Sequence, residues 1–535
     1  MRRLIDAGDA RRILSEIKIS YDVVKIPVHL ASGRVLAEDV YSPISIPPFR
    51  RATRDGYAVI SDDVVSADER NPVLLKVIGK VEAGEFRSIA VKSGTAVEIS
   101  TGAVMPESAD AVVMVENTSL KDGFVQIRKS VSPGENVMEE GSDLTAGEML
   151  ASEGEMLDTL KTGLIAGAGI SEVKVKEMRT GIISTGNELL MPGKKIEPGK
   201  IYDVNAFAIH SELKKLGATP VLMGIAGDDE KEMMSMLERA LKECDAVITS
   251  GSTSAGKGDI LYRIVEEHGE MLFHGVSVKP GKPFFAGIIK KKPVFGLPGF
   301  PTSCLTIFME FVADVIAESL GYRPERKIAR GRTAKRIYSE GRRELMPVIL
   351  VRNRIFPVEK GSGAITSLSE ASGYMEIREG EEIIERGMER EVRIFGKIYD
   401  FAVGGLDIHD LIDWHGDVKR LTHNPELARL EFMRGNLDAV FYPEGGYEIP
   451  YGFYGKKGRT GAVYGYGIDA DVYAKDHRHL FNMLRLGIVD GMYILEPFAE
   501  KLGADAESDG KIEIGFDAVE DLEEIIENYL ARFRK

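Results

Sequence analysis

The sequence has little cysteine and no long apolar run. Its two cysteines, Cys244 and Cys304, lie far apart and form no CxxC pair, which argues against a disulfide framework and favours buried thiols in a reducing compartment. The first residues contain no apolar core of a signal peptide, and no stretch of about 18 apolar residues could span a membrane. We therefore expect a cytoplasmic protein without membrane contacts.

A net positive charge is also missing, as are the usual signatures of zinc binding and covalent catalysis. The formal net charge is −15, so we expect no nucleic-acid binding, and an anionic substrate must be met by local basic residues or by a cation. The nine histidines show no metal-ligand spacing, and the sequence has no GxSxG motif. Both zinc chemistry and a serine nucleophile are therefore disfavoured.

The composition is that of a globular protein, with 44% hydrophobic and 29% charged residues. A chain of 535 residues predicts several domains, each with its own core. We predict a multidomain protein of α/β and β domains. The expected parts are a mixed helical and β region at 1–174 with an inserted β domain at about 45–135, an α/β domain at 175–326, a small β domain at 327–396, and an extra α/β module at 397–535.

The central α/β domain is indicated by β-rich runs that alternate with helical patterns. This alternation predicts βαβ units on a mainly parallel sheet. The amphipathic patterns predict helices at 204–216, 229–243, 259–268 and 302–320 in this domain, and at 3–18 and 516–533 near the two ends of the chain.

The segment DAVITSGSTSAGKGD at 245–259 is the most informative stretch of the chain. An apolar strand ends in a loop of small residues, whose backbone N–H groups and hydroxyls can bind an anion. Its spacing imitates a Walker A loop, but Gly258 and Asp259 stand where the magnesium-binding Ser or Thr and the helix are needed. We therefore predict a phosphate site of another kind, with the loop residues Gly251, Ser252, Thr253 and Ser254 as its members, next to Ser250.

Three acidic residues follow predicted strands of this domain: Glu188 in STGNEL, Asp228 in GDD, and Asp259. Loops at the carboxyl ends of parallel strands meet at one edge of the sheet. Carboxylates that converge there can hold Mg²⁺, which takes oxygen ligands and shares them with phosphates. The alternative is three independent turns or helix caps, and Asp228 or Asp229 is expected to cap the next helix.

Two further segments have the composition of an anion pocket. VKPGKP holds Lys279 and Lys282 in a stiff turn, so that two ammonium groups can oppose an anion at little entropic cost. GLPGFPTS at 296–303 places glycines and prolines before a helix, which predicts a phosphate or carboxylate site at the helix N-terminus. Thr302 or Ser303 is expected to cap that helix, and both interpretations can hold together.

Taken together, these segments resemble the molybdopterin molybdenumtransferase family, which includes the catalytic end of gephyrin. RDGYAV, TGAVMPESADAVVMVE, SPGENVMEEGSDL, STGNEL, TSGSTSAGKGD, VKPGKPFFAG, GLPGFPTS and GSGAITSLSEASGY occur in the family order over about residues 1–396. The resemblance implies a three-layer molybdopterin-binding α/β domain and a β-barrel-like small domain. It also implies a reaction in which molybdate is inserted into adenylylated molybdopterin and AMP is released with the help of Mg²⁺.

The resemblance further implies roles for individual residues. Glu188, Asp228 and Asp259 would hold the metal and pyrophosphate, Thr253 and neighbouring amides the phosphate, and Lys279 and Lys282 the molybdate or the pterin phosphate. A second subunit would complete the cleft, so the family implies a homodimer. The remaining residues that it implicates are Pro298 and Pro301 in the pocket, Ser362 from the small β domain, and Asp55, Thr101 and Asp143 on the partner side.

The sequence departs from the family pattern at two positions. Ser252 stands where the second glycine of the loop is usual, and Gly275 stands where a basic residue often precedes the lysines. Tungstate therefore stays an alternative to molybdate. The segment from 397 onward resembles a shortened periplasmic-binding-protein-like module. Two other functions stay open: adenylyltransferase activity, which is the preceding step and whose enzyme is a candidate partner, and a gephyrin-like scaffold without catalysis.

Overall fold

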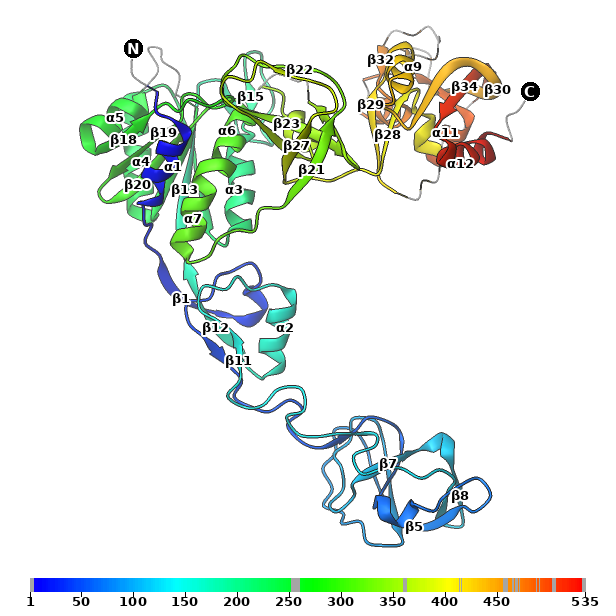
Figure 1. The fold of residues 1–535 in the computed structure, drawn as a ribbon. Coiled ribbons are helices and arrows are strands. Elements are labelled where there is room, and N and C mark those ends of the chain that lie inside the picture. The colour runs from blue at the N-terminus through cyan, green and yellow to red at the C-terminus, as the bar shows by residue number, and fades with distance from the viewer. Residues whose placement is uncertain are drawn as a thin grey trace.

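The computed structural model has five parts (Figure 1). They are an N-terminal arm, a β domain inserted into this arm, an α/β domain, a small β barrel and a C-terminal module. The structure describes residues 4–251, 260–358, 363–412, 414, 416–455, 460–463, 466, 470, 472–486, 488–489, 491–502 and 507–531. Figure 1 shows the α/β domain, the barrel and the C-terminal module along the top, with the inserted β domain at the far end of an extended N-terminal arm.

The α/β domain contains one six-stranded sheet in which four neighbouring strands pair in parallel, and the two strands at one side of the sheet are added by antiparallel pairing. The sheet is thus mainly parallel, as predicted. In spatial order its strands are β16 (Thr219–Ala226), β13 (Arg179–Thr185), β17 (Ala246–Ser250), β20 (Lys292–Leu297), β19 (Phe285–Ile289) and β18 (Glu270–His274). The ribbon β14 (Leu189–Leu190) and β15 (Ile201–Tyr202) follows β13.

Apolar residues cover both faces of this sheet, since consecutive strand residues point to opposite sides. Ile182 and Ile248 belong to one buried cluster, while their neighbours Ile183 and Val247 belong to another. The first cluster includes residues of α1 (Ala7–Ser15), α3 (Asn205–Lys215), α6 (Pro301–Ile307), the π-helical turn η4 (Phe308–Val312) and α7 (Ala313–Leu320), and the second includes those of α4 (Glu230–Glu243) and α5 (Ile260–His268).

The predicted helices of this domain are found close to their expected bounds, whereas the two outlying ones are shorter than predicted. The helix expected at 3–18 covers only Ala7–Ser15, because Asp6 caps its N-terminus and Ile5 pairs with Val276 instead. The helix expected at 516–533 is α12 (Glu520–Leu530). Phe516 instead lies in the strand β34, where it pairs with Phe441 and packs against a buried cluster of the C-terminal module.

The N-terminal arm and the inserted domain are built from short strands. The arm pairs β1 (Asp22–Pro27) with β12 (Glu172–Glu177) and β2 (Val40–Tyr41) with β11 (Met149–Ala151), and it includes η1 (Val28–Leu30) and α2 (Thr159–Gly167). The inserted domain has a six-stranded sheet with the order β7 (Ala111–Met114), β4 (Gly56–Val59), β6 (Thr95–Ile99), β5 (Val73–Val81), β9 (Phe124–Ile127) and β8 (Thr118–Lys121). The turns η2 (Ser61–Val64) and η3 (Val115–Asn117) and the pair β3 (Arg51–Ala52) and β10 (Val137–Met138) complete it.

The small β domain is a closed five-stranded barrel, which is consistent with its β-rich sequence. Its strands are β21 (Ile328–Thr333), β24 (Arg354–Pro357), β23 (Glu344–Val351), β25 (Gly373–Ile377) and β27 (Glu389–Ile394). The ribbon β22 (Ile337–Tyr338) and β26 (Ile383–Ile384) and the short helix α8 (Thr366–Glu370) lie outside the barrel wall.

A buried carboxylate joins this barrel to the α/β domain. Glu310, in the π-helical turn, is fully buried and forms ion pairs with Arg11 of α1 and Arg393 of β27. Tyr374 of β25 donates a further hydrogen bond to it over 3.2 Å. Burial, together with the charges of nearby arginines, lowers the pKa of Arg11 to about 10. Helix α1, the α/β domain and the barrel therefore share one ionic cluster.

The C-terminal module, residues 397–531, is an α/β unit with one seven-stranded sheet. Its strands are β29 (Val418–Thr422), β28 (Phe401–Gly405), β30 (Ala439–Gly455), β33 (Gly491–Leu495), β31 (Thr460–Val463) and β32 (Val472–Ala474), with β34 (Glu507–Ala518) paired to β30. Its helices are η5 (Asp407–Leu411), α9 (Pro425–Met433), α10 (His477–Arg485), α11 (Glu496–Leu502) and α12.

Candidate functional site

Three parallel strands of the α/β domain end at the same edge of the sheet. The pairing of β13 with β16 and β17 runs to Thr185 opposite Ala226 and to Ser184 opposite Ser250. The loops that follow therefore begin side by side. Of the predicted carboxylates, Glu188 and Asp228 lie in two of these loops, and both are exposed. The structure thus brings these two predicted segments together at one edge.

Asn187 connects the two acidic loops directly. Its side-chain amide donates a hydrogen bond to the carboxylate of Asp228 over 3.0 Å, and its oxygen accepts one from the backbone N–H of Asp228 over 3.2 Å. The adjacent Glu188 folds back over Gly186, where an added Cβ would lie 2.5 Å from a carboxylate oxygen. Two carboxylates are consequently presented from neighbouring loops, with one of them held by an amide.

Asp229, rather than Asp228, caps the following helix. The side chain of Asp229 accepts a hydrogen bond from the backbone N–H of Glu232 over 2.9 Å at the start of α4. This is the usual role of an acidic residue at a helix N-cap. The predicted helix cap is therefore Asp229, and the carboxylate of Asp228 is available for another role.

Gly251 directly follows the third strand, β17, in a conformation that excludes a side chain. Its φ is +101°, and a Cβ there would lie 2.2 Å from the carbonyl oxygen of Thr185. The Gly251 N–H donates a hydrogen bond to the carbonyl of Leu297. Gly299 also lies close by, since a Cβ added to it would be 3.4 Å from the Cα of Gly251. The predicted anion loop thus starts in contact with the turn after β20.

The predicted lysine turn packs next to α6 and the barrel. A Cβ on Gly281 would lie 2.2 Å from the side chain of Ile307, so glycine permits close contact with this helix. The ammonium of Lys279 lies 3.4 Å from Glu340 and 3.5 Å from Glu344 of the barrel, whereas Lys282 is exposed. Lys279 therefore sits at the junction of the α/β domain and the barrel.

The turn before α6 differs from the expectation in one respect. Neither Thr302 nor Ser303 caps this helix: the N-cap is Phe300, which makes no side-chain cap, and Pro301 occupies the first helical turn. A proline needs no N–H partner there, so the helix can start without a polar cap. The hydroxyl of Thr302 instead donates to the carbonyl of Ala364 over 3.3 Å, which ties the turn to the segment before α8. Pro298 is buried beside it.

Three further polar residues of this edge are not predicted by the sequence motifs. Asp203 is buried and accepts hydrogen bonds from Ser184 and from the N–H of Ala206. Asn205 is also buried, and its amide donates to the carbonyl of Gly299 over 2.8 Å. The ammonium of Lys200 donates to the carbonyl of Asn187. The sequence offers one signal for Asp203 and Asn205: in the run IYDVNAF, an acid and an amide stand at the start of a helical pattern.

Asp55 and Thr101 contact each other, but far from this edge. The carboxylate of Asp55 accepts a hydrogen bond from the N–H of Thr101 over 2.7 Å, and this bond lowers the pKa of Asp55. Both residues belong to the inserted β domain, and Asp143 lies in the adjoining segment, where it is exposed. Figure 1 shows this domain and the α/β sheet at opposite ends of the N-terminal arm. One chain therefore does not bring the two sets together.

Several predicted residues fall outside the part of the chain that the structure describes. These are Ser252, Thr253, Ser254, Asp259 and Ser362. Among the described residues, no group of three or more His, Cys, Asp or Glu side chains is arranged to hold a metal ion. Glu188 and Asp228 nevertheless supply carboxylate oxygens, which are the ligands that suit Mg²⁺.

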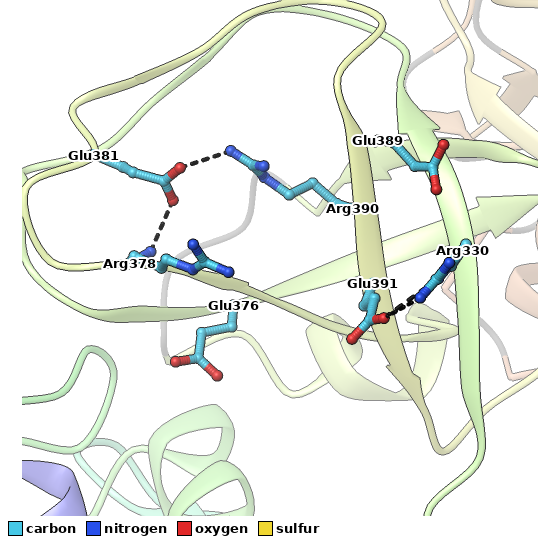
Figure 2. A pocket seen from close by; sticks show the side chains of 7 residues that line it. All are labelled: Arg330, Glu376, Arg378, Glu381, Glu389, Arg390 and Glu391. Carbon is cyan, nitrogen blue, oxygen red and sulfur yellow. Dashed lines mark hydrogen bonds and ion pairs between the residues drawn. The ribbon is translucent and has the colours of Figure 1, made fainter.

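A separate pocket of about 570 Å³ lies on the barrel (Figure 2). Charged side chains alone line it, and some pair with one another: Arg330 lies 3.0 Å from Glu391, and Arg390 lies 2.7 Å from Glu381. The other lining residues are Glu376, Arg378 and Glu389. Because its charges are mixed and no predicted residue lines it, this pocket does not form the predicted phosphate site.

The two thiols are buried and unpaired, as the sequence predicts. Burial raises the pKa of Cys244 to about 11 and raises that of Cys304 further. Neither is therefore a reactive thiolate at neutral pH. Among the described residues, no helix has both the length and the apolar character needed to cross a membrane.

These parts define a multidomain protein built around a parallel α/β domain with a strand-end site. Three family descriptions match successive parts of the chain: "MoeA N-terminal region (domain I and II)" at residues 5–169, "Probable molybdopterin binding domain" at 181–318, and "MoeA C-terminal region (domain IV)" at 330–395.

Known relatives agree with this assignment. Molybdopterin molybdenumtransferase 2 of Mycobacterium tuberculosis is 32% identical over 398 residues, which cover 71% of this chain and 97% of the relative. Molybdopterin molybdenumtransferase of Haemophilus influenzae is 34% identical over 318 residues, covering 59% and 78% of the two chains. A crystal structure of a molybdopterin biosynthesis MoeA protein from Pyrococcus horikoshii matches 74% of this chain and 100% of its own, with 40% identity and a TM-score of 0.65. The chain belongs to the molybdopterin molybdenumtransferase family.

Proposed function

We propose that this protein inserts molybdate into adenylylated molybdopterin and releases AMP. In this reaction the dithiolene sulfurs bind the molybdenum, and water cleaves the phosphoanhydride, so that AMP leaves with one phosphate while the other stays on molybdopterin. The observation that carries the proposal is the strand-end edge, where Asn187 holds Asp228 beside Glu188 and Gly251 opens the anion loop. Family membership supports the same reaction.

The acidic loops would hold a magnesium ion on the phosphoanhydride. Glu188, Asp228 and Asp259 would be its ligands, and their oxygen chemistry fits this hard cation. When bound, the ion would neutralise the negative charge of the two phosphates. The chain itself would orient the substrate, since Asn187 fixes the Asp228 carboxylate and Gly251 lets the backbone approach a phosphate closely.

Basic and small residues would bind the rest of the substrate. Backbone and hydroxyl donors of Ser252, Thr253 and Ser254 would face the phosphate, while Lys279 and Lys282 would face molybdate or the pterin phosphate. Pro298 and Pro301 would shape the pocket wall, and Ser362 would reach it from the barrel side. The junction position of Lys279, between the barrel and the α/β domain, supports this arrangement.

A homodimer would complete the site. Asp55 and Thr101 lie in the domain at the far end of the arm, so we propose that they and Asp143 act on the α/β domain of a second subunit. The adenylyltransferase that makes the substrate is the proposed functional partner. The buried free thiols support a location in the cytoplasm.

The test is AMP release from adenylylated molybdopterin with added Mg²⁺ and either molybdate or tungstate. We expect AMP release to require the oxyanion and to fall at least about tenfold in Asp259→Ala and in Lys279→Ala, since each removes a charge aimed at the substrate. Lys18→Ala, at an exposed lysine outside the site, serves as the matched control. Unchanged AMP release in both site variants would refute the assignment. Synthesis rather than consumption of adenylylated molybdopterin would indicate the adenylyltransferase instead.

A further inference from the structure

The outer face of the barrel is apolar where the C-terminal module packs on it. In β23, Val348 and Leu350 point into the barrel core, while Ile349 and Val351 belong to a second buried cluster outside it. Phe356 of β24 joins that outer cluster. These side chains would be exposed on a barrel that stood alone, so their burial favours docking of the module.

Residues of the C-terminal module supply the other half of this cluster. Ala402, Ala428, Leu437 and Val440 are buried in it, at 2% exposure or less. They come from β28, α9, the turn before β30 and β30 itself. The module is therefore docked on the barrel through a shared core rather than joined to it by the chain alone (Figure 1).

Polar contacts fix the orientation of the docked module. Arg354 of β24 forms an ion pair with the buried Asp438, whose carboxylate also accepts from the N–H of Ala402 over 2.7 Å. Tyr399 donates its N–H to the carbonyl of Leu350 and accepts from the N–H of Arg352. Backbone and side-chain contacts on both sides of the apolar cluster thus hold the module in one position.

One contact of the module reaches α8. This helix follows closely after Ser362, the residue proposed to reach the substrate from the barrel side. The ammonium of Lys419 in β29 lies 3.8 Å from the carboxylate of Glu370, the last residue of α8, and 5.6 Å from the ring centre of Tyr399. The Lys419 side chain is only 16% exposed, so water screens this pair less than it screens a surface pair.

The same segment touches the proposed pocket at its other end. Ala364 accepts the hydrogen bond of Thr302 at the start of α6, and a Cβ on Gly363 would lie 3.6 Å from the ring of Phe300. A continuous series of contacts thus runs from Lys419 through α8 to the turn beside Pro301. Contacts of this kind couple the C-terminal module to the proposed pocket when they hold residues 363–370 in one arrangement.

We propose that the C-terminal module positions the segment 363–370 for the reaction, with Lys419 as the positioning residue. This rests on the proposed function, because the segment matters to catalysis only if the neighbouring pocket binds the substrate. Lys419 does not touch the pocket itself. It holds Glu370, and α8 in turn holds the loop against α6.

The test uses charge reversal in the full-length chain. Lys419→Glu places a like charge opposite Glu370, and the double variant Lys419→Glu/Glu370→Lys restores opposite charges. We expect hydrogen exchange of the amides in 363–371 to speed up about tenfold in the single variant and to return close to the original rate in the double variant. Lys397→Glu is the matched control, since it breaks the exposed pair with Asp417 elsewhere in the module.

Kinetics provide the second readout. Lys419→Glu is expected to raise KM for adenylylated molybdopterin about tenfold with kcat changed less. In this variant the segment 363–370 must become ordered when the substrate binds, which lowers the net binding free energy. Unchanged exchange in 363–371 would overturn the proposal whatever the enzyme activity. If the original chain releases no AMP, the proposed function fails, whereas an active chain with unchanged KM in Lys419→Glu refutes the positioning role alone.

Discussion

Asn187 and Asp228 exchange two hydrogen bonds across adjacent loops, one from the Asn187 amide to the carboxylate and one from the Asp228 N–H to the Asn187 oxygen. The pair ties the loop after β13 to the loop after β16. It also separates Asp228 from Asp229, since only Asp229 caps α4. Two adjacent acidic residues with different partners therefore give a direct test of which one serves the site.

We expect Asp228→Ala and Asp229→Ala to have opposite profiles. Asp228→Ala should lower AMP release at least about tenfold with little loss of stability, because an exposed carboxylate is removed from the proposed metal site. Asp229→Ala should cost about 1 kcal/mol through the lost helix cap while activity is largely kept. Steady-state AMP release and thermal unfolding of both variants decide this. Equal activity losses would show that Asp228 has no special role.

Gly251 offers a test of the close approach between strand ends. A Cβ at this position would lie 2.2 Å from the Thr185 carbonyl, so Gly251→Ala should destabilise the α/β domain by at least about 2 kcal/mol and abolish AMP release. Gly193→Ala is the control, because Gly193 has a similar φ of +91° but no atom within 4 Å of its Cβ position. A control variant as damaged as Gly251→Ala would indicate that backbone strain alone, and not the contact, matters.

The sequence allowed much of the central domain to be predicted because its signals are local. Apolar runs followed by small or acidic residues placed Glu188 and Asp228 after strands, and 3.6-residue periodicity placed α3 and α4. Thr302 could not be resolved in this way, since its hydroxyl binds Ala364, a residue 62 positions away. The same holds for Asp203, whose carboxylate accepts a hydrogen bond from Ser184, 19 positions earlier in the chain.

Docking of the C-terminal module illustrates the same limit. The consecutive apolar residues PVILV at 347–351 are typical of a strand buried on both faces. The pattern does not say what covers the outer face, because Ala402 and Val440 come from a different part of the chain. The helix predicted to start at Phe516 is wrong for a related reason: the pairing of Phe516 with Phe441 in the sheet overrides the amphipathic pattern around it.

The ionic cluster at Glu310 leads to a prediction about domain assembly. Glu310→Gln leaves Arg11 and Arg393 without their shared buried anion, so it should destabilise the contact between α/β domain and barrel by about 3–5 kcal/mol. Glu318→Gln, which breaks a pair with the exposed Arg323, should cost less than about 1 kcal/mol. Hydrogen exchange in α7 and β27 measures both effects. Similar protection in the two variants would contradict a structural role for the cluster.

The stability of the C-terminal module should depend on pH through His423. Burial, followed by the positive charge of Arg420, lowers the pKa of His423 to about 4, with Lys475 acting in the same direction and Asp476 and Asp407 opposing it. An unfolded histidine has a pKa near about 6.5, so the unfolded chain binds the proton more readily. The stabilisation is therefore present above pH 6.5 and is lost as the pH falls towards about 4.

We expect hydrogen exchange in β28 and β29 of the full chain to accelerate over this pH window, after correction for the intrinsic pH dependence of exchange. His423→Gln cannot take up the proton and should flatten the dependence, although His409, whose pKa burial also lowers, will retain part of it. His29→Gln, at an exposed histidine of the N-terminal arm, is the control and should leave the profile unchanged. If His423→Gln shows the full original slope, another group controls the acid sensitivity of this module.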